Sequence, residues 1–279
     1  LTTLLRLELT DLLVTQTEST AVADVQAILS SSPSLSPADS ARANLIVGKI
    51  HCQQSDYTKS LILLEKAFAY YTVATVTKPT AYIRNLALQA AYLLGHCYAA
   101  QQCFDEAHAV WRQGLTWAEM NHDNQRKAEL LLVIGQTANT QGVYQQALSV
   151  SEQALSLNDI RIEIDLHYCA GLSALRLGSL DVAKSHMRTL VKKARKRQLA
   201  GGDYRATIHE IEGLLVLCEA QLVSDNLQAA RHSVNSALNS IRRIGRNDLR
   251  VVANRLRQKI QARAERVPER NQLPVIFAV

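Results

Sequence analysis

A pair of small residues twelve positions apart recurs five times along this chain, and this recurrence constrains the fold more than any other feature. A bulky residue stands three positions before the second member of each pair. The small pairs are Gly48 and Ser60, Gly95 and Ala107, Gly135 and Ala147, Gly171 and Ala183, and Cys218 and Ala230, and the bulky residues are Tyr57, Phe104, Tyr144, Leu180 and Leu227. A short pattern repeated at intervals of a few tens of residues is typical of proteins in which similar units stack side by side.

Each repeat contains two segments with helical periodicity, separated by a short polar turn. In the first repeat, Leu45, Ile46 and Ile50 precede a turn at 53–56, and apolar residues at three- and four-residue spacing follow it. This spacing predicts two amphipathic helices. A small residue at the crossing point lets the two helices approach closely. Because neither helix can bury its apolar face alone, neighbouring pairs must stack.

The expected helix boundaries carry residues that favour caps and turns. Asp56 and Asp225 are expected to cap the second helices of the first and fifth repeats, and Ser36 followed by Pro37 predicts a helix start. Asn247 is expected to cap a last helix that ends near Arg266.

These repeats resemble tetratricopeptide repeats (TPR) over residues 41–245. The residues that carry the resemblance are Leu94, Gly95, Tyr98, Phe104, Ala107 and Trp111 in the second repeat, and Ile134, Gly135, Tyr144, Ala147, Ala154 and Leu155 in the third. The family's closing Pro is missing and the spacing is longer and uneven, as in bacterial TPR-containing regulators. The resemblance implies an all-α fold, a right-handed α-α superhelix of about five to six helix pairs with a C-terminal capping helix.

On this basis we divide the chain into four segments. Residues 1–39 are expected to form a degenerate helix pair and a loop, 40–245 the repeat array, 246–268 the capping helix and 269–279 an apolar tail. No segment is apolar over the roughly 18–20 residues that a membrane span needs, and no signal peptide is evident. The five Cys are scattered singly, which predicts free buried thiols and a reducing, cytoplasmic setting.

The sequence contains no recognisable catalytic, cofactor-binding or metal-binding motif. It has no phosphate-binding loop, no nucleophile elbow and no His or Cys pair at metal-ligand spacing. The neighbours His51 and Cys52, and likewise His96 and Cys97, diverge on a helix, so neither pair predicts a metal site. We therefore expect a non-enzymatic protein without a cofactor or a metal.

The resemblance also implies where a partner binds. In the TPR family, a fixed set of positions on each first helix lines the inner groove, and an extended peptide or a protein segment lies along it. The polar and aromatic residues at those positions are Arg42, Lys49, Gln53, Gln89, Tyr92, His96, Glu129, Gln136, Asn139, Asp165, Tyr168, Arg176, Glu212 and Glu219. Leu45 stands where the family's carboxylate clamp has its leading Lys, so binding of acidic chaperone tails is not expected.

The net charge of +6 comes from the C-terminal half, where a basic run lies at 192–197. Its cations are Lys192, Lys193, Arg195, Lys196 and Arg197. They suit either a patch for nucleic acid, an acidic partner or anionic lipid, or a solvated helix end whose charges complement the helix dipole. No aromatic residues interleave with them, which favours the solvated or partner-facing interpretation over nucleic-acid binding.

Together these features predict a non-enzymatic scaffold that binds a peptide or protein segment in its groove, within a larger cytoplasmic regulator. Two alternatives stay open. One is a domain that senses a small ligand or peptide and controls a fused output domain, for transcription or signalling. The other is nucleic-acid binding through the basic C-terminal half. The sequence predicts no oligomeric state.

Overall fold

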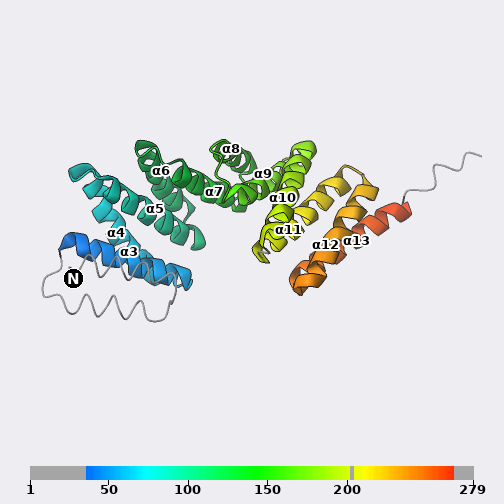
Figure 1. Cartoon of the computed structure of the whole chain (residues 1–279), viewed down its shortest axis with the longest axis horizontal. Helices are drawn as coiled ribbons and strands as arrows, with labels where there is room; N and C mark the ends of the chain where they lie inside the picture. Colours follow the sequence, from blue (N-terminus) through cyan, green and yellow to red (C-terminus); the bar gives the residue numbers. More distant parts are fainter. Residues whose placement is uncertain (1–35, 202–203, 267–279) are drawn as a thin grey trace, which may run out of the picture. The chain divides into compact units, whose positions relative to one another are not determined.

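The structure is a computed structural model that describes residues 36–201 and 204–266. Eleven helices make up this part of the chain, and no strand is found in it (Figure 1). In chain order they are α3 (Pro37–Gln53), α4 (Tyr57–Thr77), α5 (Ala81–Ala100), α6 (Phe104–Met120), α7 (Asn124–Thr140), α8 (Tyr144–Leu155), α9 (Glu163–Arg176), α10 (Leu180–Gly201), α11 (Tyr204–Val223), α12 (Leu227–Ile244) and α13 (Asn247–Arg266). The prediction of an all-α repeat fold is confirmed. The expected N-terminal helix pair and the apolar tail at 269–279 lie outside the described residues.

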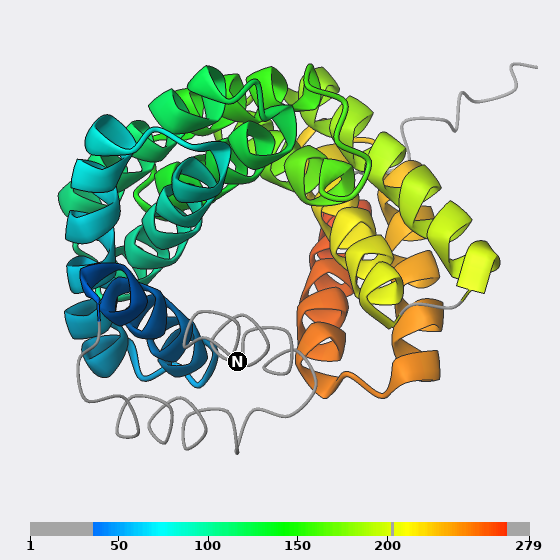
Figure 2. The ribbon, with the colours of Figure 1, turned by 60° about the vertical axis from the view of Figure 1, so that its left-hand side comes forward.

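The chain forms two compact units whose boundary, at Thr137 and Ala138, falls within α7. In the first unit, α3 packs on α4, α4 on α5 and α5 on α6, and α3 also contacts α5. In the second unit, each helix from α8 to α13 packs on the next, and α9 and α13 both contact α11 (Figure 2). First helices of successive pairs therefore touch one another within a unit. Helix α13 contacts α11 just as α9 does, so the predicted capping helix takes the place of a further first helix.

All five turns inside the helix pairs share one backbone geometry. The second residue before each second helix has a positive φ, between 58° and 78°; these residues are Ser55, Gln102, Gly142, Gly178 and Asp225. The amide of the next residue donates to the carbonyl five positions back, at 2.8–2.9 Å. This is the hydrogen-bond pattern of a helix that ends with a left-handed residue. The five helix pairs are therefore joined by the same kind of turn.

The bulky residue of the sequence pattern is the first residue of each second helix. Tyr57, Phe104, Tyr144, Leu180 and Leu227 begin α4, α6, α8, α10 and α12. Asp56 caps α4 by accepting a hydrogen bond from the Lys59 amide, as predicted. The prediction for Asp225 is wrong: it adopts the left-handed conformation itself, and the side chain of Asn226 caps α12.

The two ends of the described array begin and end close to the predicted places. Ser36 accepts a hydrogen bond from the Asp39 amide, and Pro37 is the first residue of α3. Asn247 is the first residue of α13 rather than its cap, because the Arg246 carbonyl already accepts from the Arg250 amide. None of the helices in the described ranges is long and apolar enough to cross a membrane.

The small residues allow the two helices of a pair to come into contact, and a large side chain fills the space that they leave. A Cβ on Gly48 would lie 2.8 Å from the Leu64 side chain, and a Cβ on Gly95 would collide with the indole of Trp111. Both large residues are buried and stand sixteen positions after their glycine. The Ser60 hydroxyl, twelve positions after Gly48, donates to the Gly48 carbonyl at 2.7 Å. The twelve-residue pattern thus marks a direct contact between helices.

The core of the second unit is aliphatic and lies along α11. Ile211, Leu214, Leu217 and Cys218 are buried between the helices on either side, together with Met187 of α10. Small residues from α10 and α12 complete this core, so the helix axes stay close and few aromatic side chains are needed.

Substitution of Gly95 by Ala is expected to lower the free energy of unfolding by about 1–3 kcal/mol, the usual cost of overpacking a core. The added methyl group must displace Trp111, which is 1% exposed and whose Nε1–H donates to the Tyr92 carbonyl. Urea unfolding of the purified chain measures the change. Gly201→Ala is the control, because no atom lies within 4 Å of a Cβ at that position. Equal stability of the Gly95 variant and the wild type would contradict this role of Gly95.

Candidate functional site

In the first unit, the predicted groove residues of α3 and α5 form one face. Lys49 and Gln53 are spaced four residues apart on α3, and Gln89, Tyr92 and His96 follow helical spacing on α5. Gln53 and His96 are exposed and the other three are half-buried. We call these five residues the α3/α5 face. The apolar stripes of both helices are buried, so the face is the side of each helix that the core does not use.

His96 joins the two helices of this face. Its Nδ1 lies 3.7 Å from the Sγ atom of Cys52, and its ring centroid lies 6.1 Å from that of Tyr57. Both distances connect the first repeat to the second. The α3/α5 face is therefore continuous from one repeat to the next.

Behind His96, two buried thiols share a small polar cluster. The Ser60 hydroxyl and the Cys97 Sγ atom are 3.2 Å apart. Hydrogen bonding from the Cys52 thiol, with His96 and Ser60 as further partners, holds the pKa of Cys97 below its usual range, and the same pairing raises the pKa of Cys52. The structure brings Cys52 of one His–Cys neighbour pair beside His96 of the other. In the described ranges, no three His, Cys, Asp or Glu side chains are grouped so that they could hold a metal ion.

Arg42 does not belong to an open surface. Its side chain is only 4% exposed, so the expectation that it presents a charge to a ligand is wrong. Position 42 falls on the buried side of α3, beside Ala41 and Ala43. Arg42 stands seven residues before Lys49, close to two full turns, so the two share a side of α3, and that side is buried at position 42 and half-buried at position 49.

Three predicted residues lie on α7. Glu129 is half-buried and accepts a hydrogen bond from Arg126 at 2.8 Å. Gln136 is exposed. Asn139 differs from both, because its amide nitrogen donates to the Cys169 carbonyl at 3.2 Å and its amide oxygen accepts from the Ser173 hydroxyl at 2.8 Å. These bonds tie α7 to α9 inside the second unit, so the amide of Asn139 is engaged by the fold and has a structural role.

In the second unit, most of the predicted charged residues pair with one another or with neighbours. The carboxylate of Asp165 lies 3.5 Å from both Arg205 and His209. Arg176 of α9 lies 3.9 Å from Glu219 of α11. These ion pairs run between α9 and α11, and they reduce the charge available to a ligand.

Two further predicted residues are half-buried on this side of α9 and α11. Burial raises the pKa of Glu212, and the nearby charge of Asp165 adds to that effect. His209 lies 3.7 Å from the Glu212 carboxylate. Burial also raises the pKa of Tyr168. The α9/α11 side is thus a connected polar layer, in contrast to the α3/α5 face.

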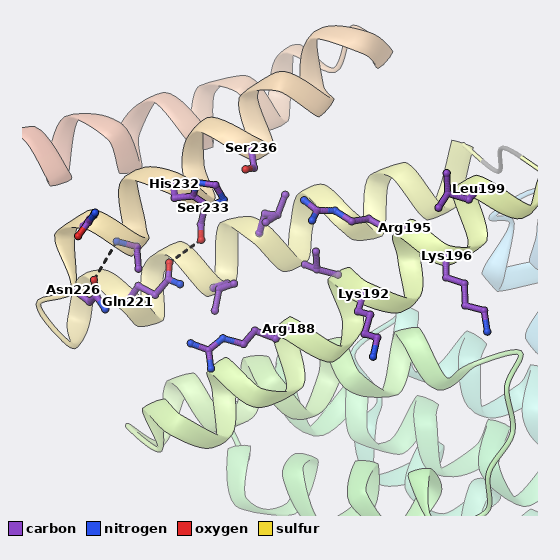
Figure 3. Close-up of a pocket in the computed structure, with 15 residues that line it drawn as sticks. Arg188, Lys192, Arg195, Lys196, Leu199, Gln221, Asn226, His232, Ser233 and Ser236 are labelled. Carbon is purple, nitrogen blue, oxygen red and sulfur yellow. Dashed lines mark hydrogen bonds between the residues drawn. The ribbon is translucent and has the colours of Figure 1, made fainter.

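The basic run does not form a single patch. Lys193 pairs with Glu163, and the Arg197 guanidinium donates to the carbonyls of Ile160 and Arg161, so both side chains fasten α10 to the start of α9. Lys192, Arg195 and Lys196 lie on another side of α10, next to α11 and α12 (Figure 3). The expectation of one five-residue patch is therefore wrong, because residues one position apart on a helix point about 100° apart.

Replacing Asn139 by Ala is expected to lower the free energy of unfolding by about 1–3 kcal/mol, because Ser173 and the Cys169 carbonyl lose a buried partner. Thermal unfolding followed by circular dichroism measures the loss. Gln145→Ala, at an exposed site on α8, is the control. An Asn139→Ala variant as stable as the control would return Asn139 to the set of possible ligand contacts.

No known protein-family profile matches the chain, and no curated protein matches it in sequence. Solved structures do match it. RapI in its apo form has a TM-score of 0.64 at 10% identity, covering 94% of this chain and all of RapI. A putative kinesin light chain with TPR-like repeats, from Podosopora anserina, has a TM-score of 0.58 at 12% identity, covering 76% of this chain and 100% of that chain.

NprR, solved in complex with its cognate peptide NprX, has a TM-score of 0.55 at 14% identity, covering 86% of this chain and 67% of NprR. At these identities the likeness concerns the fold alone. The chain has a divergent TPR-like helical repeat fold.

Proposed function

We propose that this chain is a non-enzymatic interaction module that binds an extended peptide or protein segment on its first helices, within a larger cytoplasmic regulator. The observation that carries the proposal is the α3/α5 face, where amide, imidazole, ammonium and phenol groups lie on neighbouring first helices. The shared turn geometry supports this proposal, because similar turns give successive pairs a similar register.

The chemistry of this face suits a peptide main chain. Gln53 and Gln89 each carry an amide that can donate and accept, and an extended peptide presents alternating N–H and C=O groups. Tyr92 supplies a flat amphipathic surface at low entropic cost. His96, held next to Cys52, adds an imidazole that can donate or accept a hydrogen bond.

The solved structures add support of a more general kind. NprR was solved with a peptide bound, and its fold is like that of this chain. This makes peptide binding a natural function to test for the present chain. The ion pairs between α9 and α11 favour α3 and α5 over the second unit as the main contact surface.

The test is selection of a random 12-residue peptide library displayed on phage against the purified chain. The triple variant Gln89→Ala, Tyr92→Ala, His96→Ala is expected to weaken the selected peptides on the order of ten-fold or more, as loss of several central contacts does. Isothermal titration calorimetry measures the affinities, and circular dichroism checks that the variant is folded.

The matched control is Ile62→Ala, Lys66→Ala, Val73→Ala on α4, three exposed residues of a second helix. It is expected to leave the affinities within about two-fold, the range of energetically neutral contacts. The proposal fails if no peptide is enriched, or if the α4 variant weakens binding as much as the α5 variant.

A further inference from the structure

A cavity of about 980 Å³ lies between α10 and α12, with α11 as its floor (Figure 3). It is formed entirely by residues 188–236 of the second unit. The α11 residues that line it, Leu214, Leu217 and Gln221, are on the opposite side of that helix from Glu212 and Glu219. The cavity is therefore a different surface from the predicted groove, and the proposed function does not use it.

The floor of this cavity is aliphatic. Val191, Leu214 and Leu217 are each 8% exposed or less, and they form an apolar base. Leu199 stands at the mouth with 90% of its surface exposed. Leu199 thus adds an exposed aliphatic group to the apolar part of the lining.

One wall of the cavity carries unpaired positive charge. Arg188, Lys192 and Lys196 follow four-residue spacing along α10, and within the described ranges none of them lies within salt-bridge distance of a carboxylate. Arg195, beside them, is held at 2.7 Å by the buried Glu210. No Asp or Glu is among the residues that line the cavity.

Some polar groups of the lining already have partners within the fold. The Ser233 hydroxyl donates to the Gln221 side chain at 2.8 Å, and the Asn226 side chain caps α12 (Figure 3). The formal charges of the lining nevertheless lie on α10, beside the aliphatic floor.

From this arrangement we propose that the cavity binds an acidic amphipathic protein segment. Its carboxylates pair with Arg188, Lys192 and Lys196, and its aliphatic side chains fill the base around Leu214 and Leu217. Charge complementarity identifies the occupant, because a row of cations without carboxylates selects anionic groups. The apolar base further requires that the bound segment carry aliphatic side chains as well as carboxylates.

The same features speak against a nucleic acid in this cavity. A single strand needs aromatic side chains on which its bases stack, and the lining residues include none apart from the imidazole of His232. The cations lie along one helix beside an aliphatic base, and that base offers no favourable contact to a phosphate backbone. The exposed positions of Lys192, Lys196 and Leu199 also leave the cavity open, as suits a chain segment rather than an enclosed small molecule.

The experiment uses the same 12-residue phage library and a charge-reversal variant, Lys192→Glu, Lys196→Glu. Clones that bind the variant are removed first, and the remaining clones are then selected on the wild-type chain. The remaining clones are expected to be enriched in Asp and Glu together with Leu, Ile, Val or Phe. Fluorescence anisotropy of the labelled peptides is expected to show on the order of ten-fold weaker binding to the charge-reversal variant, and weaker binding to Leu199→Ser.

The matched control is Arg231→Glu, Lys259→Glu, which has the same net charge as the charge-reversal variant and changes two exposed residues that do not line the cavity. It is expected to bind the peptides within about two-fold of the wild type. The proposal is overturned if no clone distinguishes the two proteins, if the clones lack acidic residues, or if the control weakens binding equally.

Nucleic acid is tested on the same proteins with a labelled 20-nucleotide single strand at 150 mM salt. Binding of this strand more tightly than the selected peptides, with loss on the Lys192→Glu, Lys196→Glu variant, would assign the cavity to nucleic acid instead. The α5 triple variant separates the two proposals, because it is expected to leave the cavity peptides unaffected. Failure of the α3/α5 face and failure of the cavity therefore give different results.

Discussion

The structure depends on the close contact between the two helices of each pair. Gly48 and Gly95 leave no side chain at the crossing, so Leu64 and Trp111 can lie against the backbone of the preceding helix. The left-handed residue in each turn then fixes where the second helix begins. Every turn has the same hydrogen bond, so equivalent positions of the helix pairs have similar surroundings. Side chains at equivalent positions of neighbouring pairs can therefore contribute to one surface.

This arrangement gives the chain two kinds of surface. First helices contact first helices, so polar side chains such as Gln89 and His96 gather on one side. Second helices are held apart by the first helix between them, and the space between α10 and α12 becomes a cavity. The first surface offers amides and aromatic groups, whereas the second offers cations over an aliphatic base. One repeat geometry therefore produces two surfaces of different chemistry.

The sequence predicted the repeats, the helix pairs and most of their ends, because small residues and turn residues act locally. The partners of a side chain often belong to neighbouring repeats, and the spacing of residues within one repeat does not identify those partners. Arg42 is buried and Asn139 is bound to Ser173, although both have positions of groove residues. The basic run was counted as one patch, whereas Lys193 faces the start of α9. The contacts of Gly48 with Leu64 and of Gly95 with Trp111, sixteen positions later, were not part of the twelve-residue pattern.

Hydrogen exchange with and without a selected peptide tests the central claim most directly, that the first helices carry the binding face. Mass spectrometry resolves the exchange rates of individual helices. If the first helices carry the binding face, the peptide slows exchange in α3 (Pro37–Gln53) and α5 (Ala81–Ala100) and leaves the exchange rates of α4 unchanged. Slower exchange confined to the second helices, with α3 and α5 unaffected, would contradict it.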